Sequence, residues 1–208
     1  MLELKNLSFD YPDEGFNHRI APLLHDVCFG LKSGSMLHLR GNNGSGKTTL
    51  LKLLAGLVPP LEGTIYYRGQ CVAKQLAMYQ EQLCYVGHKA GISQALTVLE
   101  NCRFDLQYAR SDSTVLSGLL RRFSLYELKD VPCHVLSAGQ RRRVGLLRLM
   151  LSNAKLWLLD EPLVALDQDS IEILMVCLNE HVQKGGGVVL TSHQRLPLDM
   201  RDYQEYCL

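Results

Sequence analysis

Apolar residues along the chain follow two spacings, one typical of strands and the other of helices. Residues 2–9 carry Leu2, Leu4, Leu7 and Phe9 among polar neighbours, which predicts a strand. Further short apolar runs predict strands at 36–40, 64–67, 83–86, 155–159 and 188–191. Helical spacing predicts helices at 47–57, 101–109, 141–151 and 171–184. Turn-forming residues predict a loop at 10–22 and a hairpin within 63–72.

Capping residues mark where two of these helices start. Thr97 is followed three residues later by Glu100, and Ser137 by Gln140, so each pair has the spacing of a capping box. Strands alternate with helices at both ends of the chain, whereas residues 89–152 are mostly helical. The pattern therefore predicts an α/β fold with a parallel sheet and a helical insertion. We expect one domain over residues 1–208, with its core in 1–88 and 153–208.

Composition and charge narrow the class of protein. Apolar residues make up 47% and charged residues 21% of the 208 residues, as is ordinary for a globular domain. The formal net charge of +1 gives no electrostatic attraction for nucleic acid, so no nucleic-acid partner is expected. No run reaches the roughly 18 apolar residues of a membrane span, and the first residues lack the features of a secretory signal.

The seven cysteines are scattered, odd in number and without a CxxC pair. This usage favours reduced, mostly buried thiols over a disulfide framework or a metal site. We therefore expect a soluble, intracellular protein.

A glycine-rich loop between a predicted strand and a predicted helix matches the phosphate-binding pattern G-x-x-x-x-G-K-[ST]. Its residues are Gly41, Asn42, Asn43, Gly44, Ser45, Gly46, Lys47 and Thr48. Glycines allow backbone N–H groups to wrap around phosphates, and the following helix adds its positive N-terminal end. We expect Lys47 to reach the phosphates, Thr48 to ligate Mg²⁺ and Thr49 to add phosphate contacts. The loop predicts Mg-ATP binding.

Two acids, Asp160 and Glu161, directly follow the apolar strand at 155–159. In open α/β sheets, ligands bind at the carboxyl ends of the strands. Asp160 is expected to hold Mg²⁺, and Glu161 to act as the general base that activates water. The alternative is a pair of solvated acids, which leaves the phosphate-binding loop without an acidic partner.

Residues 136–140 read LSAGQ and separate this chain from other proteins with the same phosphate-binding loop. Together with that loop, the acid pair, Asp167 and His193, they resemble the ABC ATPase family, whose signature is LSGGQ. The motifs occur in the family's order across residues 11–193. The resemblance implies a P-loop NTPase (RecA-like) core, an antiparallel β subdomain and a helical ABC subdomain at 89–152.

The same resemblance implies roles for further residues. Ser137, Gly139 and Gln140 are expected to face the nucleotide held by a second copy, which gives an ATP-sandwich homodimer. Asp167 is expected to link the two sites, with helix capping as its alternative role. His193 is expected to contact the γ-phosphate as a catalytic residue, beside Glu161.

Two predictions concern the edges of the site. Tyr11 is expected to stack on adenine, with Phe9 and Phe16 as alternatives.

Four arginines follow the signature, and we expect them to form a solvated helix face, with a nucleotide or partner contact as the alternative. They are Arg141, Arg142, Arg143 and Arg148.

The chain departs from the ABC pattern at one position. His88 stands where the family usually carries the Q-loop glutamine, and Gln94 follows several residues too late to replace it. We expect His88 to lie near Mg²⁺. The segments 85–92 (YVGHKAGI) and 96–101 (LTVLEN) resemble the ATP-binding subunits of cytochrome c maturation export systems, in which a Gly-His pair occupies this place.

This subfamily resemblance implies an ATPase that drives haem export or the release of a haem-loaded chaperone. It also implies a CcmB-like integral membrane partner, other cytochrome c maturation proteins, and a peripheral location on the cytoplasmic face of the inner membrane. Other possibilities are the ATPase of another small ABC exporter and a soluble ABC ATPase, although 208 residues leave no room for two ATPase halves. Intact Lys47, Asp160, Glu161 and His193 argue against a module without hydrolysis.

Overall fold

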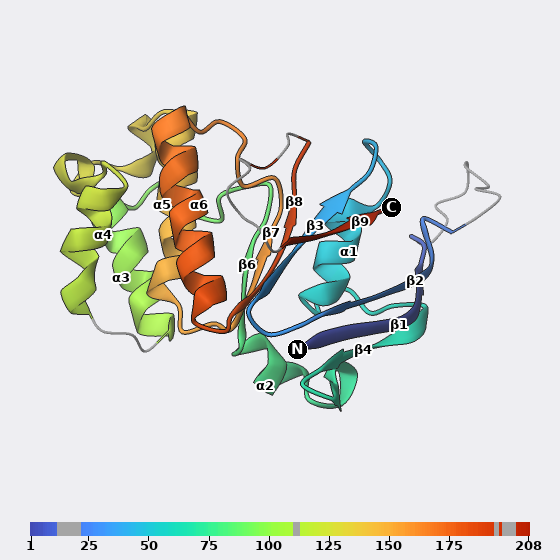
Figure 1. The fold of residues 1–208 in the computed structure, drawn as a ribbon. Helices are drawn as coiled ribbons and strands as arrows, with labels where there is room; N and C mark the ends of the chain where they lie inside the picture. The colour runs from blue at the N-terminus through green and yellow to red at the C-terminus, as the bar shows by residue number, and fades with distance from the viewer. Residues whose placement is uncertain (12–21, 110–112, 194–195, 197–202) are drawn as a thin grey trace.

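The structure is a computed structural model that describes residues 1–11, 22–109, 113–193, 196 and 203–208. In this part of the chain the strands form two sheets, with helices packed around them (Figure 1). The predicted loop at 10–22 lies almost wholly outside the described residues.

The smaller sheet is antiparallel and lies at one end of the molecule (Figure 1). Its order is β2 (Leu24–Leu31), β1 (Leu2–Phe9), β4 (Glu62–Tyr67) and β5 (Gln70–Cys71). The strand predicted at 2–9 and the hairpin within 63–72 are confirmed. The pattern misses β2, because its buried residues Leu24, Val27 and Leu31 do not alternate. Register shifts in the β1–β2 pairing interrupt the period of two.

The larger sheet is parallel and confirms the predicted α/β class. Its order is β6 (Leu83–Val86), β7 (Leu156–Leu159), β8 (Gly187–Thr191), β3 (Ser35–Arg40) and β9 (Tyr203–Cys207). All four pairings are parallel, and β7 is buried throughout, as expected for a central parallel strand. The pattern misses β9, an edge strand with three exposed residues and no apolar alternation.

The helices begin and end where caps and glycines allow. They are α1 (Lys47–Leu54), α2 (Leu76–Gln80), α3 (Val98–Ala109), α4 (Leu116–Arg122), α5 (Ala138–Leu151) and α6 (Gln168–Gln183). The helix α1 ends earlier than predicted, because Gly56 adopts a left-handed φ of 65° just beyond it. Both α3 and α5 start three residues earlier than predicted, directly after their caps Thr97 and Ser137. The short helices α2 and α4 are not predicted.

Two apolar cores lie on opposite faces of the parallel sheet. One lies between the sheet and helices α3 to α6, and the other is shared by the sheet, α1 and the antiparallel sheet (Figure 1). On β3, Met36 faces the first core while Leu37 and Leu39 face the second, as strand alternation requires. Packing on both faces holds the carboxyl ends of the strands in place, and the site lies there.

Two further predictions concern thiols and membranes. The cysteines are free, and four of them are buried, in agreement with the prediction: Cys84, Cys102, Cys133 and Cys177. Among the helices of the described residues, none combines the length and apolar character needed to cross a membrane.

Candidate active site

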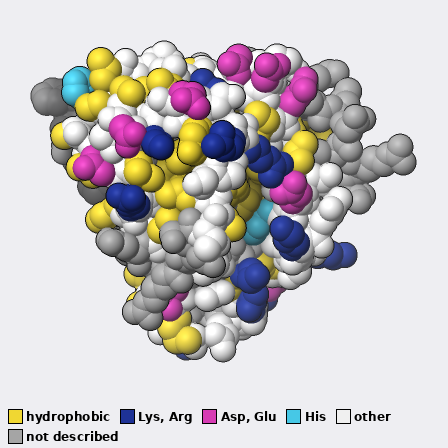
Figure 2. Space-filling model, turned by 90° about the vertical axis from the view of Figure 1, so that its left-hand side faces the viewer, with side chains coloured by type: hydrophobic (Ala, Val, Ile, Leu, Met, Phe, Trp, Pro, Cys, Tyr) yellow, Lys and Arg dark blue, Asp and Glu magenta, His cyan; other side chains and the backbone are white. Residues whose placement is uncertain are grey.

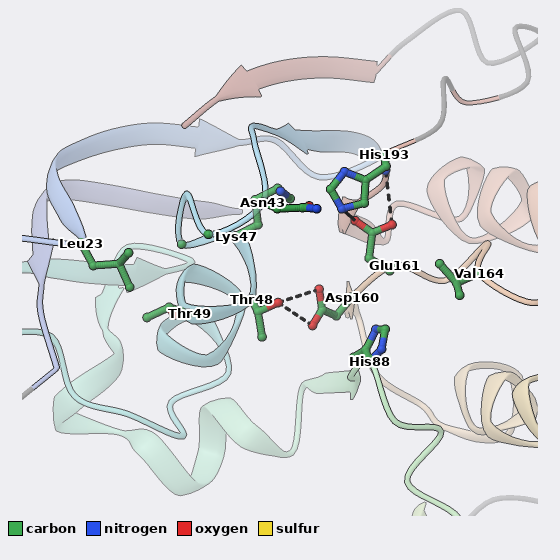
Figure 3. A pocket seen from close by; sticks show the side chains of 12 residues that line it. Leu23, Asn43, Lys47, Thr48, Thr49, His88, Asp160, Glu161, Val164 and His193 are labelled. Carbon is green, nitrogen blue, oxygen red and sulfur yellow. Dashed lines mark hydrogen bonds and ion pairs between the residues drawn. The ribbon is translucent and has the colours of Figure 1, made fainter.

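A cavity of about 430 Å³ lies where β3, β7 and β8 end. Figure 3 shows the residues that line it, which come from segments far apart in the chain. They are Leu23, Asn43, Gly44, Gly46, Lys47, Thr48, Thr49, His88, Asp160, Glu161, Val164 and His193. The structure therefore brings the phosphate-binding loop, the acid pair, His88 and His193 together at one edge of the sheet.

The phosphate-binding loop is shaped by its glycines and by Lys47. Gly46 has a left-handed φ of 96°, and a Cβ atom there would lie 2.7 Å from Cδ2 of Leu24. Only glycine fits that position. The buried Lys47 donates through Nζ to the carbonyl oxygens of Gly41 (2.7 Å) and Asn42 (2.9 Å). Its ammonium group is thus held over the loop.

Asp160 is buried, and two hydroxyl groups donate hydrogen bonds to its carboxylate. The Thr48 hydroxyl donates to Oδ2 at 2.9 Å, and the Thr191 hydroxyl donates to Oδ1 at 3.0 Å. Thr191 is the last residue of β8 and is fully buried. Sequence reasoning missed its part in the site, because a threonine at a strand end fits ordinary β propensity.

Glu161 is held from two sides. Its backbone N–H donates to the Thr191 hydroxyl at 2.8 Å. Its carboxylate oxygen Oε2 accepts from the backbone N–H of His193 at 3.3 Å, and Oε1 lies 3.3 Å from Nε2 of His193 (Figure 3). The residue has a left-handed φ of 50°, which is rare for a side chain of this size. Such outliers gather at functional sites.

His88 lines the cavity on the Asp160 side (Figure 3). It also borders a neighbouring cavity that includes Gln94. Gln94 is not among the residues that line the first cavity, so the later glutamine does not replace His88 beside Asp160.

Tyr11 contacts Thr49, the residue that directly follows the phosphate-binding loop. Its hydroxyl is 3.1 Å from Oγ1 of Thr49, and its ring packs edge-on against Phe9 with centroids 5.1 Å apart. Tyr11 is half exposed whereas Phe9 is buried, so Phe9 has no free face for a base. The other alternative, Phe16, lies outside the described residues.

The signature residues are not among the lining of this chain's own cavity. Ser137 and Gln140 form the predicted capping box: the Gln140 N–H donates to the Ser137 hydroxyl, and the Ser137 N–H donates to the Gln140 side chain. A Cβ atom on Gly139 would lie 2.6 Å from the carbonyl oxygen of Ala165, so close packing requires glycine there. Asp167 caps α6 by accepting from the Ser170 N–H at 3.0 Å.

The expectation of a solvated face for the four arginines is wrong. Each donates hydrogen bonds to nearby groups: Arg141 to Leu136 O, Arg143 to Phe123 O, Arg148 to Asp105 and Gly91 O, and Arg142 to several backbone carbonyls. Arg142 is buried, because α5 packs it against the segments that carry His88 and Glu161. Burial lowers the pKa of Arg142, while the carboxylates of Asp160 and Glu161 act in the opposite direction.

A phosphate-binding loop and an acid pair at the end of a parallel sheet define a P-loop nucleotide hydrolase. The family model described as ABC transporter matches residues 24–164. The cytochrome c biogenesis ATP-binding export protein CcmA of Legionella pneumophila (strain Lens) is 51% identical over 208 residues, which is 100% of both chains. The chain thus belongs to the ABC transporter family, within its CcmA group, and is an ABC-type ATPase.

Solved structures agree with this assignment. The ATP-binding subunit of an ABC transporter superposes with a TM-score of 0.82 at 31% identity, covering 92% of this chain and 79% of that one. The dimeric post-hydrolysis state of the ATP-binding cassette MJ0796, bound to ADP and Pi, gives a TM-score of 0.78 at 26% identity. It covers 93% of this chain and 88% of that one. These neighbours support the P-loop NTPase fold with an antiparallel β part and a helical ABC part.

Proposed function

We propose that this chain is the ATP-hydrolysing subunit of an ABC-type export complex of cytochrome c biogenesis. In that complex it drives haem export or the release of a haem-loaded chaperone. The observation that carries the proposal is the placement of Asp160, Glu161 and His193 around one cavity with Lys47, which is a full hydrolytic set. The names of the CcmA relatives support the pathway.

The residues of the cavity suit a nucleoside triphosphate with a divalent cation. In the phosphate-binding loop beside the cavity, Ser45 Oγ is buried without a hydrogen-bond partner among the described residues, and a phosphate oxygen would supply one. When bound, Mg²⁺ neutralises phosphate charge, and Thr48 and Asp160 would hold it with His88 nearby. The described residues contain no cluster of three His, Cys, Asp or Glu side chains able to hold a metal alone. Mg²⁺ bound mainly through phosphate and water fits that finding.

Each residue then has a chemical task. Glu161 takes the proton from the attacking water, and His193 orients Glu161 and contacts the γ-phosphate. Lys47 and the loop N–H groups stabilise charge on the phosphates. Tyr11 stacks on the adenine, and Thr49 adds a phosphate contact. The reaction is ATP + H₂O to ADP + phosphate.

The site needs a second copy of the chain for its other half. Ser137, Gly139 and Gln140 lie at the start of α5, away from this chain's own cavity, and Asp167 lies at the start of α6. In the ATP-sandwich homodimer these residues face the nucleotide of the partner. The dimeric cassette among the structural neighbours supports this arrangement.

A CcmB-like membrane subunit and other cytochrome c maturation proteins are the proposed partners, on the cytoplasmic face of the inner membrane. Figure 2 shows the helical end of the molecule, where apolar side chains lie among charges of both signs. Exposed apolar residues of the segment 89–152 include Leu96, Phe104 and Val135. This mixed surface supports a protein partner over nucleic acid. We assign residues 89–152 to the helical subdomain and 1–88 with 153–208 to the core.

Phosphate release by the chain co-expressed with its membrane subunits tests the proposal. Lys47→Ala should abolish turnover, and Lys52→Ala on the same helix should not, because Lys52 does not line the cavity. The complex should co-purify, and the Lys47→Ala strain should lack mature cytochrome c. Undiminished phosphate release by Lys47→Ala would contradict the assignment of this cavity as the ATPase site. Normal cytochrome c maturation in a strain whose only copy of this chain is inactive would contradict the proposed role in cytochrome c biogenesis.

A further inference from the structure

Arg142 on α5 is a buried cation that bridges two loops of the active site. Its Nη1 donates to the carbonyl oxygens of Gly87 (2.8 Å) and His88 (3.3 Å). Its Nη2 donates to those of Asp160 and Glu161, each at 2.8 Å, and Nε to that of Pro162 at 3.5 Å. The side chain is 5% exposed. One guanidinium therefore satisfies carbonyl groups of two segments that are more than 70 residues apart in sequence.

The contacts of Arg142 with the carbonyl oxygens of Asp160 and Glu161 require a turn of the backbone between them. Successive carbonyl groups of an extended strand point in opposite directions, so they cannot both reach one nitrogen atom. Here both reach Nη2, because the chain turns at Glu161, whose φ is 50°. A left-handed conformation costs energy for a non-glycine residue and persists only where its surroundings enforce it. Charge-assisted hydrogen bonds from a buried guanidinium are strong enough to contribute to that enforcement.

The same turn sets the direction of the Glu161 side chain. Beyond it, the carboxylate reaches both the backbone N–H and the Nε2 of His193. We propose that Arg142 is a positioning residue for hydrolysis: it holds Glu161 in the conformation that aims its carboxylate at His193. This rests on the proposed role of Glu161 as the general base.

The bridge also joins the His88 segment to the carboxylate pair. The carbonyl groups of Gly87 and His88 bind one arm of the guanidinium, and those of Asp160 and Glu161 bind the other. A displacement of one segment is therefore transmitted to the other through a planar, rigid group. Lysine cannot replace it, because a single ammonium nitrogen does not span both sets of carbonyls.

The test compares Arg142→Lys with a matched control, Arg148→Lys, in the full chain with its membrane subunits. Arg148 lies on the same helix and also donates to a backbone carbonyl, that of Gly91, and to Asp105. Arg142→Lys should lower kcat by about 30- to 100-fold, as expected for a misplaced reacting group. KM for ATP should stay unchanged, because the phosphate-binding loop is not altered. Arg148→Lys should leave kcat near the wild-type value.

Hydrogen–deuterium exchange of the isolated folded chain gives a readout independent of turnover. Arg142→Lys should speed exchange in peptides covering both 86–89 and 159–164, whereas Arg148→Lys should leave both unchanged. Wild-type kcat in Arg142→Lys, or faster exchange in only one segment, would overturn the inference. An equal loss of kcat in Arg148→Lys would also overturn it, because the effect would then reflect the stability of the helix rather than the contacts of Arg142. Absence of ATPase activity in the wild-type complex would instead defeat the proposed function.

Discussion

His193 contacts Glu161 through two atoms, its backbone N–H at 3.3 Å from Oε2 and its Nε2 at 3.3 Å from Oε1. The Glu161 side chain is 12% exposed, whereas that of His193 is 51% exposed. The histidine ring thus covers a carboxylate that is mostly withdrawn from solvent. A carboxylate held in this way can be changed to an amide with little change of shape, so its charge can be tested separately from its packing.

Glu161→Gln should lower kcat by at least about 100-fold, because an amide cannot accept the proton of the attacking water. ATP binding should persist, since the phosphate-binding loop is intact. The variant should therefore accumulate as an ATP-bound dimer, which size-exclusion chromatography in Mg-ATP would detect. Glu172→Gln, an exposed charge removal on α6, is the matched control. A Glu161→Gln chain that binds ATP yet stays monomeric would contradict the sandwich dimer.

Thr191→Val should weaken both the fold and the hydrolytic step. The Thr191 hydroxyl accepts from the Glu161 N–H and donates to Asp160, and valine of similar shape leaves both groups without that partner. We expect the free energy of unfolding to fall by about 1–3 kcal/mol, together with a drop in kcat. Thr191→Ser keeps the hydroxyl and should retain most of kcat. Chemical denaturation and steady-state ATPase assays measure both effects. Equal loss of kcat in the two variants would contradict a role for the hydroxyl, because Thr191→Ser keeps it.

The placement of three proposed catalytic side chains could be predicted from the sequence, because each follows a recognisable strand. Lys47, Asp160 and His193 come after the strands at 36–40, 155–159 and 188–191, and parallel strands end at one edge of a sheet. Local patterns were therefore enough to bring them together, and the structure confirms the three strands.

Long-range contacts are what the sequence could not supply. The carbonyl partners of Arg142 lie 18 to 55 residues away, and nothing in a run of arginines distinguishes the one that is buried. For β2, bulges hide the strand period, and β9 is an edge strand whose residues are mostly exposed. The burial of Arg142 and the pairing of these two strands depend on contacts with distant segments, so the local sequence pattern does not predict them.

His88→Gln should retain ATPase activity stimulated by the membrane subunit, whereas His88→Ala should lose much of it. Glutamine keeps a donor and an acceptor beside Asp160, but alanine removes both from the cavity wall. Activity of the glutamine variant close to that of wild type would show that any side chain with a donor and an acceptor suffices, so that the imidazole marks lineage rather than mechanism. A glutamine variant as slow as the alanine variant would show that the imidazole itself is required.

His181 should make the fold less stable in acid. Its ring stacks on Trp157 with centroids 3.8 Å apart, and burial lowers the pKa of His181 to about 4. An unfolded chain binds this proton below about pH 6.5. Between about pH 6.5 and 4 the unfolded state therefore holds more protons than the folded state, so stability is lost as pH falls through that window.

Phenylalanine keeps an aromatic ring on Trp157 and cannot be protonated. The fall in Tm between pH 6.5 and 4 should thus be smaller in His181→Phe than in wild type, while the Tm difference between the two proteins stays constant above pH 7. Parallel Tm curves across the acid window would show that His181 is protonated equally in the folded and unfolded chains.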